Sequence, residues 1–215
     1  MTSLKDRPGQ RSLRLALGLA LYGMSLAMLV KTDFGADPWT VFTQGLSQVT
    51  GFSLGQTTIV ISLALLALWC PLRQRPGVGT VANALLVGPF LDLGMAWIPT
   101  PGHWGVRVLF LAMSVVGVAV ATGLYVGAGW GPGPRDGLMT GLTQRGVPLI
   151  AARAGIEVTV LIIGWLLGGN VGLATVVFAA GIGPLVGYAL PRLTLAVEGR
   201  HGDGQDSAQT STCTP

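Results

Sequence analysis

A long internal repeat is the feature of this chain that most constrains its fold. The segment Gly35–Gln48 returns as Gly131–Gln144, shifted by 96 residues, with glycine, proline, a Gly-Leu pair and the final glutamine at equivalent positions. Further along the shift is 95, and the matching pairs are Gly77 with Gly172, Thr80 with Thr175, and Gly88-Pro89 with Gly183-Pro184. Repeats of this length in apolar chains are common in small-molecule transporters, where two halves surround a central site. The repeat therefore predicts two similar halves and a transporter-like class, without a substrate.

The composition indicates a membrane protein. Half of the residues are hydrophobic and 10% are charged, whereas about a quarter of an ordinary globular domain is charged. The 33 glycines suit membrane helices, in which small residues let the backbones approach closely. The basic residues flank apolar spans and form no patch, which argues for positive-inside anchoring and against nucleic-acid binding.

Six apolar stretches are long enough to cross the roughly 30 Å of a bilayer core, which takes about 20 residues each. They are Leu13–Val30, Leu54–Leu72, Val78–Ile98, Val106–Ala128, Leu149–Gly168 and Val171–Leu190. Two further segments, Pro38–Thr50 and Pro134–Gly146, are too short to cross, and they occupy equivalent positions in the repeat.

The distribution of basic residues tests this number of spans. With the N-terminus in the cytoplasm, Lys31 and Arg107 face outward and eleven cationic residues lie inside, which is a strong positive-inside bias. The eleven are Lys5, Arg7, Arg11, Arg14, Arg73, Arg75, Arg135, Arg145, Arg153, Arg192 and Arg200. If both short segments crossed, Arg73 and Arg75 would lie outside. Each half thus has three spans, an odd number, so the two halves must have opposite orientations.

We therefore expect an all-α polytopic membrane protein with six transmembrane helices, arranged as two inverted three-helix repeats that each carry one short re-entrant or interfacial helix. The predicted division is a cytoplasmic tail at 1–10, the first repeat at 11–99, the second repeat at 100–195 and a disordered cytoplasmic tail at 196–215. Both termini then lie on the cytoplasmic side of the plasma membrane.

Both short segments begin like helices. Pro38 and Pro134 suit the first helical position, which needs no N–H donor, and Asp37 and Gly133 precede them as N-caps. An interfacial helix would place its apolar stripe in lipid, with Trp39 at the level of the headgroups. A re-entrant half-helix would instead line a cavity, with its N-terminus near the membrane midplane. The sequence leaves both alternatives open.

The break before the second short segment, residues 127–137, contains the densest glycine and proline run in the chain. Free backbone N–H groups at a helix start, assisted by Arg135, form a candidate anion site. Alternatively, Arg135 and Asp136 are solvated anchors at the cytoplasmic boundary. The corresponding region of the first copy carries Asp33 and Asp37, which would repel an anion or attract a cation.

Polar residues at membrane depth are further site candidates, because a charge in the hydrocarbon costs roughly 2.5–3.5 kcal/mol on insertion scales. Glu157, in the fifth span, is either a functional carboxylate or the structural partner of Arg153, one turn earlier. Asp92, in the third span, is either a site residue or a carboxylate at the membrane boundary. Asn83 bonds a neighbouring helix or faces a site, and Gln56 opens the second span.

The sequence lacks the motifs of a nucleotide-binding loop and of a metal site. The only lysines are Lys5 and Lys31, so the chain has no phosphate-binding loop with a Walker lysine. His103 and His201 form no metal-ligand spacing. We therefore expect no enzymatic activity, no cofactor and no metal.

Five motifs between Leu15 and Leu190 carry a family resemblance. They are Gly35-Ala-Asp-Pro38-Trp39, Gln44-Gly45-Leu46, Arg73-Gln-Arg-Pro-Gly-Val-Gly79-Thr80, Gly131-Pro-Gly-Pro-Arg135-Asp136-Gly137-Leu-Met139 and Gly181-Ile-Gly-Pro-Leu185. In these motifs the chain resembles the YczE/YyaS/YitT-type family of bacterial integral membrane proteins, and its YczE-like branch in particular. The resemblance implies a multi-pass plasma-membrane protein without an established biochemical activity.

These features predict a transporter or permease for a small solute of unknown identity, with a central site between the repeats. The alternative is a non-transporting accessory or scaffold protein that supports another membrane complex. The expected partners are membrane lipid, the solute, and a second copy or another membrane protein, with no nucleic acid. Glycines spaced by four residues suit close helix crossings inside the chain or in a homodimer. They are Gly123/Gly127/Gly131, Gly164/Gly168/Gly172 and Gly183/Gly187.

Overall fold

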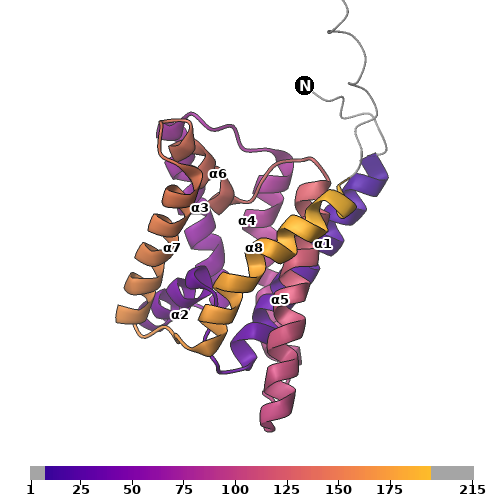
Figure 1. The fold of residues 1–215 in the computed structure, drawn as a ribbon, viewed down its shortest axis with the longest axis vertical. Coiled ribbons are helices and arrows are strands. Elements are labelled where there is room, and N and C mark those ends of the chain that lie inside the picture. The colour runs from indigo at the N-terminus through magenta and orange to yellow at the C-terminus, as the bar shows by residue number, and fades with distance from the viewer. Residues whose placement is uncertain (1–7, 195–215) are drawn as a thin grey trace, which may run out of the picture.

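The computed structural model describes residues 8–194, which form eight α-helices in one bundle and contain no strand (Figure 1). The helices are α1 (Pro8–Lys31), α2 (Pro38–Thr50), α3 (Leu54–Leu72), α4 (Val78–Trp97), α5 (Trp104–Gly127), α6 (Pro134–Thr143), α7 (Leu149–Leu166) and α8 (Leu173–Leu193). All except α2 and α6 are long and apolar enough to cross a membrane, so the predicted six spans and two short helices are present.

The helix ends follow the chemistry of the caps. The bounds of α2 and α3 coincide with the prediction, because Asp37 and Ser53 cap their first turns. The α1 helix starts at Pro8, ahead of the predicted Leu13, since its polar first turns continue the helix beyond the apolar stretch. The α6 helix ends at Thr143, before a positive φ of 91° at Gly146. The tail predicted at 1–10 thus overlaps α1, and the tail predicted at 196–215 lies outside the described residues.

Four long helices form a continuous row through the bundle. The α1 helix packs against α4 on one side and α5 on the other, and α5 packs against α8. The short helices pack across the two halves of the chain, α2 on α7 and α6 on α3. The largest fully buried side chain is Trp69 of α3, followed by Leu19, Leu29, Leu91, Val41 and Val118.

One backbone contact occurs twice, at equivalent positions of the repeat. Gly79 N–H donates to the carbonyl of Trp130 over 2.9 Å, and Ala174 N–H donates to the carbonyl of Phe34 over 2.9 Å. Gly79 corresponds to Ala174, and Phe34 corresponds to Trp130. In each case the start of the third long helix of one half docks on the loop that leads into the short helix of the other half.

The two short helices are seated by reciprocal pairs of small and large residues. A Cβ atom on Gly164 of α7 would lie 2.5 Å from the backbone of Phe42 in α2. A Cβ atom on Gly137 of α6 would overlap the ring of Trp69 in α3. Trp69 is the repeat equivalent of Gly164, so the small residue lies on the long helix in one contact and on the short helix in the other.

Both ends of the described chain lie at the same end of the bundle (Figure 1). Arg14, near the start of α1, donates from Nη1 to the carbonyl of Leu193 at the end of α8 over 2.8 Å. At the opposite end, Asp33 Oδ2 lies 3.8 Å from Arg107 Nη1, so the loop after α1 and the first turn of α5 are neighbours. The chain therefore traverses the bundle an even number of times.

Candidate functional site

A polar cavity of about 150 Å³ lies where the starts of α2 and α6 meet, between α1, α5, α7 and α8. Its charged lining residues are Asp37, Arg135, Asp136, Arg153 and Glu157, and its aromatic lining residues are Tyr22, Trp39, Tyr125 and Phe178. The structure thus brings together six of the residues singled out from the sequence, from segments far apart in the chain.

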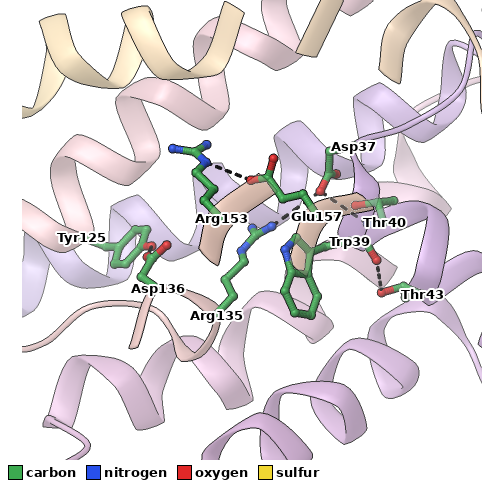
Figure 2. Close-up of polar contacts among 9 residues, drawn as sticks. All are labelled: Asp37, Trp39, Thr40, Thr43, Tyr125, Arg135, Asp136, Arg153 and Glu157. Carbon is green, nitrogen blue, oxygen red and sulfur yellow. Dashed lines mark hydrogen bonds and ion pairs between the residues drawn. The ribbon is translucent and has the colours of Figure 1, made fainter. Parts of the chain in front are cut away.

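An ion pair between the two short helices occupies the middle of this site (Figure 2). Asp37 Oδ2 lies 3.5 Å from Arg135 Nη1 and also accepts a hydrogen bond from Thr40 N over 3.4 Å. The Asp37 side chain is 1% exposed, and its Oδ1 atom has no hydrogen-bond partner among residues 8–194. The buried Trp39 Nε1 also lacks a partner within that range. Two buried polar atoms of cavity-lining residues thus have no hydrogen-bond partner within residues 8–194.

A second ion pair lies on α7, at the side of the cavity. Arg153 Nε donates to Glu157 Oε1 over 3.0 Å. The two residues are one helical turn apart, as expected if Glu157 is the structural partner of Arg153. Figure 2 shows Glu157 between Arg153 and the Asp37–Arg135 pair. Positive and negative groups therefore alternate across the site, which limits the cost of burying each charge.

Two tyrosines connect these charges to the core of the bundle. The Arg135 guanidinium lies 5.3 Å from the ring centroid of Tyr22, within the range of a cation–π contact. Tyr125 donates its hydroxyl hydrogen to Asp136 over 3.4 Å, and the two tyrosine rings meet edge to face. From the sequence alone, core packing is the default interpretation of both tyrosines, because each lies in the first span of its half. The signal that could have placed them in the site is their hydroxyl group, since a buried tyrosine usually finds a polar partner.

The ionisable side chains that line the site have a formal excess of one negative charge. Three carboxylates (Asp37, Asp136 and Glu157) face two guanidinium groups (Arg135 and Arg153). Within residues 8–194, no group of three or more His, Cys, Asp or Glu side chains is arranged to hold a metal ion.

The structure places Asp92 and Gln56 away from the cavity, at the start of α3. Asp92 accepts hydrogen bonds from Ser53 Oγ over 2.6 Å and from Gly55 N over 2.7 Å, which fastens α3 to α4. Gln56 accepts from Ser53 N over 3.1 Å and completes a capping box. Both side chains are therefore engaged by local structure.

Asp33 lies apart from the charged cluster, whereas Asn83 lies beside it. Asp33 is 69% exposed at the end of the bundle, where it pairs with Arg107 and accepts a hydrogen bond from Asn170. Asn83 lines a smaller cavity of about 60 Å³ on the side of α3 and α4. This second cavity shares Arg135 with the main one.

The loop before α6 is held by α4. Arg135, in the first turn of α6, is neutralised by the carboxylate of Asp37. Thr80 Oγ1 donates to the carbonyl of Pro132 over 2.7 Å, and the Asp37 carboxylate faces Arg135. Arg135, Asp136 and Arg153 thus all line the cavity, and the Arg153 side chain is 47% exposed.

Comparison with known proteins gives the family. The family of unknown function DUF6198 matches residues 9–191, which include both short helices and all the cavity residues. The chain belongs to this family. It is 36% identical over 177 residues to an uncharacterized protein of Haemophilus influenzae, which covers 82% of this chain and 81% of that protein. It is 33% identical over 174 residues to the uncharacterized membrane protein YczE of Bacillus subtilis, with 80% of each chain covered.

The similarity to YczE confirms the predicted family resemblance, and the six long apolar helices confirm the membrane class. No solved structure matches the chain significantly. The protein is thus a multi-pass, all-helical membrane protein of a family whose name assigns no function.

Proposed function

We propose that this protein moves a small solute across the cytoplasmic membrane through the central cavity. The observation that carries the proposal is the meeting of the two short helices at the Asp37–Arg135 pair, beside a cavity with unpartnered polar atoms. Ionisable groups in a membrane interior are costly, and they typically mark ion or substrate pathways.

The positions of the short helices support inverted repeats with re-entrant helices. At the C-terminal end of α2, Gln48 donates to the carbonyl of Gly168 in the loop between α7 and α8. At the C-terminal end of α6, Gln144 accepts from Gln74 in the loop between α3 and α4. These loops lie at opposite ends of the bundle, while the starts of α2 and α6 meet inside it. In the proposal the two helices therefore enter from opposite membrane faces.

Charge supports an orientation with both termini in the cytoplasm. The end of the bundle that contains the described termini carries Arg11, Arg14, Arg73, Arg75, Arg145 and Arg192. The opposite end carries Lys31 and Arg107. Arg135 and Arg153 line the cavity and are left out of this count. The remaining basic residues still show a positive-inside bias.

The proposal assigns solute movement and no catalysis to the site. A direct test is an uptake screen in proteoliposomes, with a panel of labelled cations, anions and zwitterions and with or without a proton gradient. Uptake above that of protein-free liposomes, reduced by Asp136→Asn in the cavity but not by Asp33→Asn at the exposed end, supports transport. Absence of uptake across the panel, together with stable co-purification of another membrane complex, supports the accessory role instead.

A further inference from the structure

The two halves differ where their second and third long helices meet. In the first half, Gly55 of α3 and Gly88 of α4 bring the two backbones into direct contact, and Asp92 bonds the start of α3. The repeat equivalents of Gly55 and Asp92 in the second half are Ile150 and Gly187. The second half therefore lacks two features of the first. It has no glycine at the position where α3 touches α4, and no carboxylate at the position from which Asp92 bonds the start of α3.

As a consequence, α7 and α8 stand apart. The α7 helix packs on α2 and α6 and makes at most a few contacts with α8 along the described chain. In Figure 1, α7 stands at the edge of the bundle, while α8 slants away from it toward α1 and α5. Ile150 is 84% exposed, and a Cβ atom on Gly183 or Gly187 would meet no described atom within 4 Å.

The main cavity lies at this separation. Its wall includes Arg153 and Glu157 from α7 and Ala179 and Gly183 from α8, and all four are at least partly exposed. On the opposite side, where α3 and α4 cross closely, the cavity is about 60 Å³ instead of about 150 Å³. Because α7 and α8 are both candidate membrane spans, an opening between them would face the hydrocarbon of a bilayer that the two helices cross.

The lining indicates the charge and the character of the ligand. The formal excess of negative charge in the lining favours a cation, since an uncompensated buried charge is costly. The aromatic residues Tyr22, Trp39 and Phe178 provide π faces that attract cations and surfaces that accept an apolar group. A route through hydrocarbon requires a ligand with an apolar body.

We propose that the cavity takes a monovalent organic cation with an apolar body, which enters sideways from the bilayer between α7 and α8. This inference rests on the proposed transport function, for which it names the substrate class and the route.

Binding to the full-length protein in lipid nanodiscs tests the ligand class without requiring transport. The probe is phenyltrimethylammonium, and the comparison compounds are its uncharged isostere tert-butylbenzene and the anion benzenesulfonate. We expect calorimetry to show at least about tenfold tighter binding of the cation, corresponding to the electrostatic contribution of the site. Equal binding of the cation and the isostere, or tighter binding of the anion, would overturn the proposal.

Charge variants outside the Asp37–Arg135 pair separate electrostatic recognition from general disruption of the fold. Asp136→Asn removes the excess formal negative charge and should weaken cation binding about tenfold. Arg153→Gln raises the excess and should tighten cation binding. A loss of cation binding in Arg153→Gln that matches the loss in Asp136→Asn, with the protein still folded, would contradict the assignment of charge.

A bulky residue in the opening tests the lateral route. Gly183→Leu should slow association of the probe about tenfold or more, whereas the matched variant Gly155→Leu should not. Both glycines are helical and have no described atom within 4 Å of a built Cβ, but Gly155 lies outside the main cavity. Unchanged association in Gly183→Leu would overturn the route. Cation binding without uptake would support this inference while contradicting transport, and uptake of other solutes without cation binding would do the reverse.

Discussion

The carboxylate of Asp37 lies 3.5 Å from the guanidinium of Arg135, so one ion pair joins the first turns of two short helices that belong to different halves of the chain. Each partner comes from the break that precedes or starts its helix. The pair therefore fixes the meeting point of the two halves, and the cavity opens beside it.

Removal of either partner of this pair should destabilise the protein. Arg135→Gln leaves Asp37 buried without a counter-charge, which typically costs about 3–5 kcal/mol, so the melting temperature in detergent should fall. Asp37→Asn preserves the N-cap of α2 but strands Arg135. The double variant should recover part of the loss, and a double-mutant cycle measures the coupling. Strictly additive effects of the two substitutions would show that the pair is not coupled.

The contact between α6 and α3 should not tolerate a side chain at Gly137. Gly137→Ala places a methyl group within the ring of Trp69, and such overpacking costs about 1–3 kcal/mol. Gly155→Ala on α7 serves as the control, because its Cβ meets no described atom within 4 Å and alanine favours a helix. Thermal unfolding of both variants measures the difference. Equal melting temperatures would show that the Gly137 contact adds nothing to stability.

Glu157 is a carboxylate at membrane depth, and we expect it to couple an ion to solute movement. Glu157→Gln preserves the shape of the side chain and removes its charge, so the protein should keep its abundance and fold while losing ion-coupled uptake. Uptake into proteoliposomes with and without a proton gradient measures this loss. If the variant transports normally but is less abundant or less stable, Glu157 is only the structural partner of Arg153.

The proposed orientation predicts a pattern of cysteine labelling. In a background without Cys70 and Cys213, a cysteine at Gln74 or Arg200 should resist a membrane-impermeant thiol reagent in intact cells. A cysteine at Thr100 should react, because the loop between α4 and α5 lies at the other end of the bundle. External labelling at position 74 is the result that the six-span topology does not allow.

The elements of the fold could be predicted from local chemistry. Pro38 with its cap Asp37, and the Ser53–Gln56 capping box, define helix starts through residues close together in the sequence. The repeat identified the two short helices as equivalent. The start of α1 at Pro8 was missed because an apolar window does not register polar turns that continue a helix.

The site was predictable only in part, because its geometry depends on contacts between distant segments. The breaks before the short helices and the charged residues at membrane depth indicated Asp37, Trp39, Arg135 and Glu157 as site residues. All four line the cavity. Composition alone does not distinguish these residues from Asp92, whose carboxylate is used by the start of α3. The distinction comes from which neighbouring groups satisfy each side chain in the folded structure.

Departures from the repeat were informative only with the structure in hand. The change from Gly55 to Ile150 keeps the span apolar, so the hydropathy pattern does not reveal its steric effect. Its effect becomes visible because Gly55 lies against the backbone of Gly88, while Gly183, the equivalent of Gly88, faces open space.

The central claim is that the cavity carries solute across the membrane, and its accessibility from both sides tests this most directly. Thr122 lines the cavity from α5, and Thr122→Cys is a conservative change. The variant is made in a protein without Cys70 and Cys213 and placed in membrane vesicles of either orientation. A small membrane-impermeant methanethiosulfonate reagent should then label position 122 from both faces. Solute that occupies the cavity should slow the reaction. Labelling from one face alone, or from neither, would contradict a transport pathway through this site.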